Sequence, residues 1–592
     1  MVKAMMTGDE AVARGAWEAG CTIATAYPGT PSTEILENVG AHYKGEIYAQ
    51  WATNEKVAME IAIGGAIGGA RSMVCMKHVG LNVAADPLFT AGYTGVTGGL
   101  VVVSADDPGC HSSQNEQDNR HYAVAAKLLL LEPSDSQECL DFTKAAFALS
   151  EQFDLVVLLR MTTRVCHSKG PVTLSDRKDT PVKPYVKNFA KYGMLPANAK
   201  VRHAAVEQAL LDVAQAANTS ALNRVEPGGP VGVITSGISY QHAREVFGDE
   251  ASYLKLGITC PLPRDLVRSF ASQYETLYVI EEGDPFLEKE VRALGFSCIG
   301  KEKIPMTGEL DAAIIRRALF GTEPADTYET ETKAPPRPPV LCAGCPHRGF
   351  FYALKKFDKQ IVRTGDIGCY SLGAQEPLGG IDALICMGGG FSLVMGMAKA
   401  LEQAGDSRKA FGLLGDSTFF HSGITGLVDV VHSEANVCLC VLDNSITAMT
   451  GHQQNPGTHI DLMGNEVPAV DILGIVRGTG LAEERIRVVD PLNLEEMQGA
   501  VKTALETNGP FVIVTKSPCV LLKDFVKSIG DRRCEVIEDA CKGCRACLKI
   551  GCPAIAFEDQ KAYIADPDGC TGCTLCMQMC NFNAIRQVGG RS

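Results

Sequence analysis

The chain has 592 residues, of which 46% are apolar and 21% are charged, and its formal net charge is −14. This length predicts three to five domains at roughly 100 to 200 residues each. The acidic balance, without a sizeable basic run, argues against nucleic-acid binding, which depends on Lys and Arg contacts to phosphates. No uncharged apolar run reaches the roughly 18 residues of a membrane helix, and residues 1–10 lack the pattern of a signal peptide, so we expect a cytoplasmic protein.

Residues 1–190 are expected to form one α/β domain with a parallel sheet, because strand-like and helical segments alternate along them. The first strand leads into the turn 27–32, where Pro and Gly break the strand and Ser32 or Thr30 can cap the following helix. A later helix opens at Glu55. The expected strands are residues 22–26, 46–50, 72–76, 100–104 and 155–159.

Two further α/β domains and a tail are expected. Residues 191–333 form the second, after a polar connection that begins near residue 171. Residues 334–530 form the third and begin with a proline-rich linker at 334–339, which favours a stiff extended segment. Residues 531–592 are the cysteine-rich tail. The expected strands of the second and third domains are 231–235, 253–256, 277–281, 411–414 and 437–442, with helices near 242–246 and 424–432.

The stretch 415–453 carries a binding signal. Asp416 and Asn444 follow two strand-like segments that a helical segment joins, so a crossover connection would bring both to the carboxyl edge of a parallel sheet. A carboxylate, an amide oxygen and a nearby main-chain carbonyl suit Mg²⁺, with phosphate completing its shell. The stretch resembles the thiamine diphosphate motif, Gly-Asp-Gly followed by Asn-Asn, with Ser417 and Asp443 as departures. An ordinary βαβ unit with a polar turn is the alternative.

Twenty-three cysteines in a chain without an export signal favour metal ligation over disulfides. The tail contains two runs of three cysteines two residues apart, each followed by a fourth. In two-cluster ferredoxins the fourth ligand comes from the other run, whereas zinc prefers two pairs. The expected ligand sets for two 4Fe-4S clusters are Cys541, Cys544, Cys547 and Cys580, and Cys570, Cys573, Cys576 and Cys552.

Together these motifs resemble the 2-oxoacid:ferredoxin oxidoreductases, a thiamine diphosphate-dependent family, and most of all its indolepyruvate-specific alpha subunits. The resemblance covers essentially the whole chain. It implies a pyrimidine-binding domain at 1–190, a transketolase C-terminal-like domain at 191–333, a diphosphate-binding domain at 334–530 and a ferredoxin domain at 531–592. It rests on Tyr-Pro-Gly-Thr-Pro-Ser (27–32), Asn-Glu-Lys (54–56), Cys-Ala-Gly-Cys-Pro-His-Arg-Gly (342–349), Gly-Asp-Ile-Gly-Cys-Tyr (365–370), Gly-Asp-Ser (415–417) and the tail.

The resemblance also implies roles for single residues. Glu55 would hydrogen-bond the pyrimidine N1′ of thiamine, with Glu60 as the second candidate, and Thr30 would face the substrate. Without the resemblance, Glu55 would simply suit the dipole at a helix start, and Thr30 would be a helix cap. The diphosphate and Mg²⁺ would be held by Gly415, Asp416, Ser417, Asn444 and the carbonyl of Ile446. A third, proximal 4Fe-4S cluster would be held by Cys342, Cys345, Cys369 and Cys519.

The implied reaction is the oxidative decarboxylation of an arylpyruvate, such as indolepyruvate, to an aryl-acetyl-CoA, with electrons passing through the clusters to ferredoxin. Coenzyme A would accept the acyl group, and a beta subunit would complete an anaerobic enzyme built as a dimer of alpha-beta pairs. Another 2-oxoacid (pyruvate, a branched-chain oxoacid or phenylglyoxylate) and a non-catalytic electron-transfer subunit are the alternatives. Candidate proton shuttles, for which structural or phosphate-contacting roles are also open, are His78, His347, His421 and His452.

Overall fold

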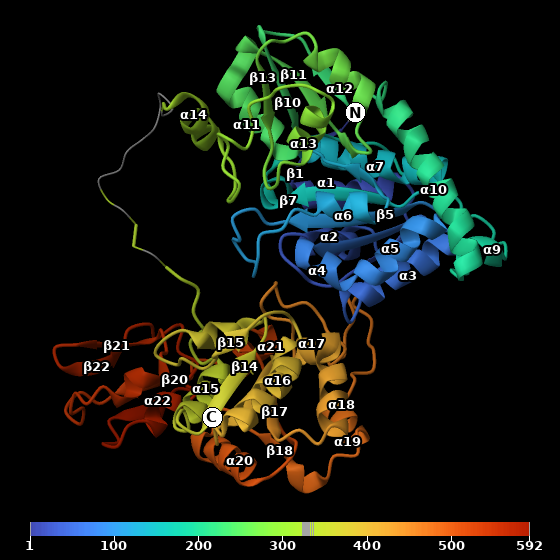
Figure 1. The fold of residues 1–592 in the computed structure, drawn as a ribbon. Helices are drawn as coiled ribbons and strands as arrows, with labels where there is room; N and C mark the ends of the chain where they lie inside the picture. The colour runs from blue at the N-terminus through green and yellow to red at the C-terminus, as the bar shows by residue number, and fades with distance from the viewer. Residues whose placement is uncertain (1, 323–331, 333, 336, 591–592) are drawn as a thin grey trace. The chain divides into compact units, whose positions relative to one another are not determined.

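The computed structural model describes residues 2–322, 332, 334–335 and 337–590 (Figure 1). The chain divides into two compact units, Met1–Thr332 with Leu462–Gly464, and Lys333–Asp461 with Asn465–Ser592. The expected linker at 334–339 lies partly outside the described residues. Along the described part of the chain, no helix combines the length and the apolar character needed to cross a membrane.

The first unit is built on a seven-stranded sheet in the order β12-β6-β7-β5-β4-β2-β3. All neighbours in it are parallel except β12, which runs antiparallel to β6. Strands β4, β5 and β7 are buried along their whole length, as expected for a parallel sheet covered on both faces. The strands are β2 (Ile23–Ala26), β3 (Tyr48–Trp51), β4 (Ser72–Lys77), β5 (Leu100–Asp106), β6 (Leu129–Leu131), β7 (Val157–Thr162) and β12 (Ile258–Cys260).

Helices cover both faces of this sheet. One core contains α1 (Gly8–Glu18), α2 (Thr33–His42) and α7 (Ser136–Phe153), and the other contains α3 (Glu55–Ile67) and α5 (Ala85–Thr94). The short helices α4 (His78–Val83) and α8 (Thr163–His167) directly follow β4 and β7, and α6 (Arg120–Ala125) lies between β5 and β6. Strands β1 (Lys3–Met6) and β8 (Gly170–Thr173) form a separate antiparallel pair.

A second sheet of the first unit has four strands in the order β13-β10-β11-β9, with β9 antiparallel to β11. Its strands are β9 (Arg224–Glu226), β10 (Val231–Ser236), β11 (Ala251–Leu256) and β13 (Leu277–Ile280). The accompanying helices are α11 (Gly237–Phe247), α12 (Arg264–Ala271), α13 (Phe286–Ala293) and α14 (Ala312–Phe320), whereas α9 (Phe189–Tyr192) and α10 (Pro196–Ala217) pack on the side of the seven-stranded sheet.

The second unit has a parallel six-stranded sheet in the order β15-β14-β16-β17-β19-β18. Its strands are β14 (Ile361–Gly365), β15 (Ala383–Leu384), β16 (Lys409–Gly415), β17 (Val437–Asp443), β18 (Ile486–Val489) and β19 (Phe511–Lys516). One core holds α15 (Pro346–Lys355) and α20 (Leu494–Glu506), and the other holds α16 (Gly389–Ala404), α18 (Ile424–His432) and α19 (Ile472–Gly478). The expected strand, turn, helix and parallel strand around residue 416 are thus present.

The tail packs on a small core of its own, to which most of its cysteines contribute. Two antiparallel strand pairs frame it, β20 with β23 and β21 with β22. Its elements are β20 (Arg533–Val536), η5 (Ala546–Ile550), β21 (Ile555–Glu558), β22 (Lys561–Ile564), α22 (Leu575–Gln578) and β23 (Ile585–Val588).

The mixed α/β class with parallel sheets is confirmed, and α18 has the bounds expected for it. The sequence did not predict the place of β12. This strand lies within residues 191–333, yet it extends the sheet formed by residues 1–190. The boundaries expected at residues 190 and 530 fall inside the two units and stay predictions.

Candidate active site

Three oxygen atoms converge at the carboxyl edge of the six-stranded sheet. Asp416 follows β16, and Asn444 follows the neighbouring parallel strand β17. One terminal atom of the Asn444 amide lies 3.2 Å from Oδ1 of Asp416 and 2.8 Å from the main-chain oxygen of Ile446, and either the amide oxygen or the amide nitrogen can occupy that place. The structure therefore brings together the three groups that the sequence singled out, and what they bind stays a prediction.

This arrangement fits a small divalent cation. Acceptors that face one another are unfavourable unless a cation or an N–H group lies between them. Neighbouring ligands of an octahedral cation bound at roughly 2.0–2.1 Å are about 3 Å apart, which matches the separations around Asn444. Turning the Asn444 amide by half a turn would place its nitrogen against both acceptors. A bound cation would select the orientation in which the oxygen faces them.

Asp416 carries the charge of this group. Its burial, together with the nearby Asp443, raises the pKa of the Asp416 carboxyl to about 7. Asn455 donates from Nδ2 to Oδ2 of Asp416 at 3.2 Å. Asp443, where the motif usually has Asn, accepts from the main-chain N–H of Ser445 at 2.9 Å and so closes the turn. A carboxylate so far from water would gain strongly from a bound cation.

The turn after β16 has little freedom. Ser417, the other departure from the motif, accepts a hydrogen bond from the hydroxyl of Thr447 at 2.9 Å, which ties this turn to the loop after β17. A Cβ on Gly415 would lie 2.7 Å from Cε1 of Tyr370, so glycine is required there. Before α18 the chain forms a π-helical turn, η3 (Phe419–Gly423), a feature often found at functional sites.

A buried network that the sequence analysis missed supports this turn. The hydroxyl of Tyr370 donates to Asp366 and lies 3.2 Å from Oγ1 of Thr418. The main-chain N–H of Gly388 donates to Oδ2 of Asp366 at 2.8 Å. Burial raises the pKa of Asp366 to about 8, although both bonds oppose the shift. Asp366 and Tyr370 belong to one motif, but Gly388 and Thr418 are far from it in the sequence, so spacing alone could not reveal the whole network.

Four cysteines share one neighbourhood beside the oxygen group. Burial raises the pKa of the Cys369 thiol to about 12, and the thiols of Cys519 and Cys342 and the carboxyl of Asp416 add to the shift. The pKa of Cys345 is also raised, by burial and then by Cys342 and Cys369. Thiols of this kind are protonated on their own and become thiolates when they bind a metal. The predicted proximal ligand set is therefore gathered next to Asp416.

The eight expected tail ligands line two separate cavities. One cavity is lined by Cys541, Cys544, Cys547 and Cys580. The other is lined by Cys552, Cys570, Cys573 and Cys576. The structure groups these side chains as the ferredoxin spacing predicted, with the fourth cysteine of each run in the other cavity. The clusters themselves stay a prediction.

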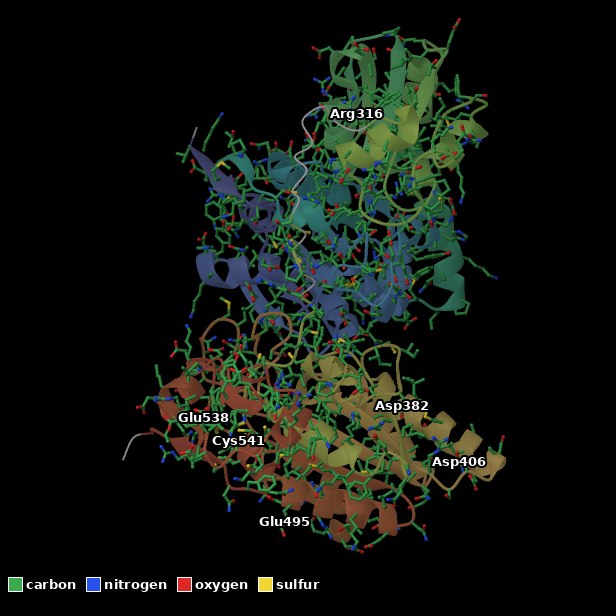
Figure 2. All side chains as sticks on the ribbon, turned by 90° about the vertical axis from the view of Figure 1, so that its left-hand side faces the viewer. Arg316, Asp382, Asp406, Glu495, Glu538 and Cys541 are labelled. Carbon is green, nitrogen blue, oxygen red and sulfur yellow. The ribbon has the colours of Figure 1, made fainter. Side chains whose placement is uncertain are left out.

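Main-chain groups also point at these sulfurs. The N–H of Ala584 donates to Sγ of Cys580 at 3.2 Å, and the N–H of Cys534 donates to Sγ of Cys570 at 3.3 Å. Such hydrogen bonds are typical of iron–sulfur sites, where they help to set the reduction potential. Lys561 donates to the main-chain oxygens of Glu538 and Cys541 at 2.8 Å, and both residues are labelled in Figure 2. Cys534 was not predicted, because it lies outside the two runs.

In the first unit, Glu55 begins α3, which the side chain of Asn54 caps. Glu55 is only 5% exposed. Its carboxylate packs against α4 at Gly80, where a Cβ would lie 2.6 Å from Oε1. The alternative, Glu60, has an exposed side chain that pairs with Lys56. Of the two candidates, Glu55 is therefore the buried carboxylate.

The turn before α2 departs from the expected capping. Ser32 occupies the N-cap position, but its hydroxyl donates to the main-chain oxygen of Gly29 at 2.9 Å. Its helical backbone angles turn the side chain away from the first N–H groups of the helix, whereas capping residues are normally extended. The prediction that Ser32 or Thr30 caps α2 is therefore wrong. Thr30 is half-buried, and contact with substrate stays its predicted role.

The four candidate histidines have different surroundings. His78 is buried, with Nε2 3.1 Å from Oδ1 of Asn115. Burial lowers the pKa of His347 to about 4, so this side chain is neutral at physiological pH. Nδ1 of His421 lies 2.9 Å from the hydroxyl of the next residue. His452 lies nearest the thiols, with Nε2 3.8 Å from Sγ of Cys519.

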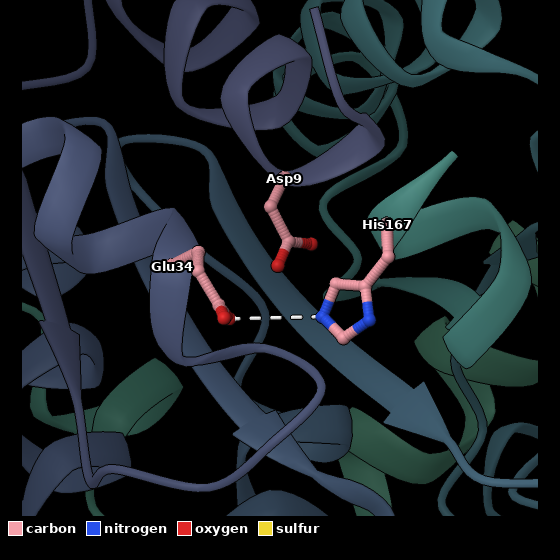
Figure 3. A group of neighbouring side chains, drawn as sticks. All are labelled: Asp9, Glu34 and His167. Carbon is pink, nitrogen blue, oxygen red and sulfur yellow. Dashed lines mark ion pairs between the residues drawn. The ribbon is translucent and has the colours of Figure 1, made fainter. Parts of the chain in front are cut away.

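A separate group in the first unit was not predicted. Asp9, Glu34 and His167 point toward one another from α1, α2 and α8 (Figure 3). Asp9 is fully buried, and among the described residues neither of its carboxyl oxygens has a hydrogen bond of normal geometry. Burial, followed by the charge of Glu34, raises its pKa well above the usual range and so favours the protonated acid. Oε2 of Glu34 lies 3.9 Å from Nε2 of His167.

Comparison with known proteins agrees with this geometry. Residues 14–227 match the family model of the pyruvate flavodoxin/ferredoxin oxidoreductase thiamine diphosphate-binding domain, and residues 366–515 match the C-terminal TPP-binding domain of thiamine pyrophosphate enzymes. Indolepyruvate oxidoreductase subunit IorA of Archaeoglobus fulgidus is 40% identical over 99% of this chain and 97% of its own length. The chain belongs to the IorA family.

Another IorA protein, from Pyrococcus horikoshii, is 37% identical over 99% of this chain and 97% of its own. The alignment with a solved 2-oxoglutarate:ferredoxin oxidoreductase from Magnetococcus marinus covers 53% of this chain and 64% of that chain, at 19% identity and a TM-score of 0.45. This likeness is too remote to support a functional inference. Membership of the IorA family confirms the resemblance seen in the motifs. The chain is an oxidoreductase subunit with two thiamine diphosphate-binding domains, which contain Glu55 and Asp416 respectively.

Proposed function

We propose that this chain catalyses the thiamine diphosphate-dependent oxidative decarboxylation of an arylpyruvate, such as indolepyruvate, to an aryl-acetyl-CoA, and passes the electrons through 4Fe-4S clusters to ferredoxin. The observation that carries the proposal is the adjacency of the oxygen group at Asp416 to the thiols of Cys369 and Cys519. A diphosphate-binding cation site beside an electron-carrier site suits an oxidation that releases electrons singly. The names of the IorA relatives supply the substrate class.

The oxygen group would hold the diphosphate end of the cofactor. Asp416, Asn444 and the carbonyl of Ile446 would bind Mg²⁺, whose charge offsets that of the diphosphate. Gly415 and Ser417 would keep the main chain close to the phosphates. Thiamine diphosphate, when bound, supplies a carbon nucleophile and an electron sink for the loss of carbon dioxide from a 2-oxoacid.

Two residues of the first unit would contact the pyrimidine ring of the cofactor and the 2-oxoacid substrate. Glu55 would bind the pyrimidine ring at N1′ and hold or release a proton at its own carboxyl oxygen. Its burial keeps water away from that carboxyl, so the proton would pass between positioned groups. Thr30 would orient the carboxylate of the 2-oxoacid with its hydroxyl. Thr30 would act as an uncharged hydrogen-bonding group, and neither role would require the fold to change.

Three sets of cysteines would hold the electron carriers. The proximal set lies beside Asp416, and the two tail sets line the two cavities of the C-terminal region. Iron–sulfur clusters accept one electron each, so several clusters in series suit a two-electron oxidation. Coenzyme A, ferredoxin and a beta subunit are the proposed partners, in a dimer of alpha-beta pairs.

The test uses the chain purified anaerobically together with its beta subunit. Bound thiamine diphosphate and about twelve irons per chain are expected, at four irons for each of three clusters. A panel of 2-oxoacids with coenzyme A and ferredoxin should show the highest kcat/KM for arylpyruvates. Best activity with pyruvate would overturn the aryl assignment, and about eight irons would remove the proximal cluster. Loaded clusters that no 2-oxoacid reduces would point to a subunit that only transfers electrons.

A further inference from the structure

Arg348 is a buried cation at the start of α15, three residues after Cys345. Its side chain is part of the second unit's interior, and the residue is only 2% exposed. A guanidinium group stays charged in proteins, so its burial requires compensation from hydrogen bonds and from negative charge. The surroundings of Arg348 supply several main-chain hydrogen bonds, and the negative charge would come from the cysteines of two predicted cluster sites.

Every hydrogen bond of this guanidinium goes to a main-chain oxygen. Nε donates to the oxygen of Cys342 at 2.9 Å, and Nη2 donates to that of Leu341. Nη1 donates to Gly551, with a longer contact of 3.4 Å to Ile550.

No carboxylate among the described residues forms an ion pair with Arg348, although buried arginines elsewhere in the chain have such partners. Arg120 pairs with Asp118 and Glu281, and Arg160 pairs with Asp106 and Glu132.

The cysteines that face Arg348 come from two different sets. Its Nε donates to the main-chain oxygen of Cys342, and its main-chain N–H donates to that of Cys345 at 3.1 Å. Cys342 and Cys345 belong to the proximal set, whereas Cys552 and Cys573 line the inner tail cavity. Arg348 lines that same cavity. The cation therefore lies between two predicted cluster sites.

The main chain brings these two sites together at the same place. Gly344, between Cys342 and Cys345, has a φ of +72°, and a Cβ there would collide with the side chain of Thr571. Thr571 lies between Cys570 and Cys573 of the inner tail set. The loop that carries the proximal cysteines is thus packed directly against the loop that carries the inner tail cysteines, with Arg348 beside the contact.

We propose that Arg348 is the positioning residue that joins the proximal cluster to the inner tail cluster, by compensating the charge of both and by hydrogen-bonding the main chain of a ligand on each side. This inference rests on the proposed function. The guanidinium bonds the oxygen of Cys342 on one side and, on the other, the oxygen of Gly551, whose peptide bond leads to Cys552. The cysteines on the Cys342 side and those on the Cys552 side would each hold a cluster, and one electron would pass between the two, oxidising one cluster and reducing the other. No proton and no other reactant is needed.

The sign of the electrostatic effect follows from charge. Reduction adds one negative charge to a cluster, and a fixed cation beside it favours the reduced form. Loss of the cation should therefore make reduction of both adjacent clusters less favourable. The outer tail cluster, held by Cys541, Cys544, Cys547 and Cys580, does not adjoin Arg348 and should keep its potential. That cluster is an internal control in the same molecule.

The experiment is an EPR-monitored redox titration of the anaerobically purified full chain and of Arg348→Gln. We expect the reduction equilibrium of two clusters to become at least tenfold less favourable, which is about 59 mV for a one-electron couple. The outer cluster should be unchanged, and Cys541→Ala, which removes one of its ligands, identifies its signal. Arg545→Gln is the matched control, because Arg545 is exposed, lines the outer cavity and lies over Phe557. Any shift in that variant should be confined to the outer cluster.

Arg348→Lys keeps the charge but cannot span both carbonyls. In this variant the equilibrium constants for reduction of all three clusters should stay within threefold of the wild type. Electron transfer between the two inner clusters should be slower, which rapid freeze-quench EPR measures. Unchanged potentials in Arg348→Gln, with full iron content, would overturn the inference. If Arg348→Gln does not fold, Arg348→Lys is the deciding variant. Clusters that load in Arg348→Lys with wild-type potentials would support the role of the charge. Loss of the clusters in both variants would overturn the inference. A wild-type chain that binds no iron would instead refute the proposed function.

Discussion

One terminal atom of the Asn444 amide lies 2.8 Å from the main-chain oxygen of Ile446 and 3.2 Å from Oδ1 of Asp416. This clustering of acceptors gives the first prediction. Mg²⁺ with thiamine diphosphate should raise the thermal stability of the wild-type chain, by about 2.7 kcal/mol at a hundredfold excess over Kd. Asp416→Ala and Asn444→Ala should lose this ligand-dependent shift in differential scanning calorimetry.

Asp443→Asn is the matched control for that measurement. Asp443 closes a turn through the N–H of Ser445, a bond that an Asn side chain can also accept. The ligand-dependent shift should therefore persist in this variant. Loss of the shift in Asp443→Asn, or its survival in Asp416→Ala, would contradict the assignment of the metal ligands.

The second prediction concerns Glu55. Glu55→Gln should lower the rate of 2-oxoacid-dependent cluster reduction by about 10²- to 10⁴-fold, the usual contribution of a positioned acid or base. Iron and thiamine contents should stay at wild-type levels. Glu60→Gln is the control, since Glu60 is exposed and pairs with Lys56 at the surface, where an ion pair contributes little to stability. Equal losses in the two variants would refute the role of Glu55.

The third prediction tests the packing behind Glu55. Gly80→Ala would place a methyl group 2.6 Å from Oε1 of Glu55, so the carboxylate must move. Activity should fall at least tenfold, because displacing a reacting group by about 1 Å can cost two orders of magnitude. Gly64→Ala in α3 is the control, since a Cβ there meets nothing within 4 Å and should raise helix stability by roughly 1 kcal/mol. Wild-type kcat in Gly80→Ala would contradict the expected contact.

The fourth prediction is a pH dependence of stability that Asp9 causes. Its pKa is raised in the folded chain, by burial and then by Glu34, with Glu10 adding and the thiol of Cys166 opposing. The folded state therefore keeps a proton that the unfolded state releases above about pH 4. The free energy of unfolding should fall as pH rises from that point, by up to about 1.4 kcal/mol per pH unit, until the folded group ionises.

Asp9→Asn should remove this fall and stabilise the first unit at pH 8 by roughly 1–3 kcal/mol, because a neutral side chain replaces a buried acid. Urea unfolding followed by tryptophan fluorescence reports on this unit specifically, since Trp17 and Trp51 are the chain's two tryptophans and both lie there. Asp86→Asn is a suitable control, because Asp86 is an exposed carboxylate of the same unit that is not among the groups acting on Asp9. A fall of equal slope in Asp9→Asn would assign the dependence to other groups, of which His167 is the nearest.

The fifth prediction separates ligands from neighbours in the tail. Cys552→Ala should lose about four irons per chain, because it removes one ligand of a 4Fe-4S cluster. Cys534→Ala should lose none, since Cys534 contributes its main-chain N–H to Sγ of Cys570 and that donor survives the substitution. Iron analysis after anaerobic desalting measures both. Iron loss in Cys534→Ala would mean that its thiol is a ligand.

Local signals predicted most of the secondary structure and much of the candidate site. Apolar strand-like segments on either side of a helical segment predicted β16 and β17. The regular spacing of the cysteines predicted how the tail side chains would group. Contacts between distant segments could not be inferred in this way. Asn455 reaches Asp416 from a loop, and Tyr370 reaches Thr418 from another turn. The capping error at Ser32 arose because residue type is local, whereas the backbone angles at that position depend on the whole turn.

The seven-stranded sheet can be completed only after the antiparallel strand β12 has been synthesised. The edge of β6 is covered by residues 258–260, which leave the ribosome long after β7 has been made. Until then the nascent chain presents an unpaired strand edge, the kind of surface on which other chains add strands. A fragment that ends at residue 190 should therefore aggregate, and one extended to residue 322 should stay monomeric on a sizing column.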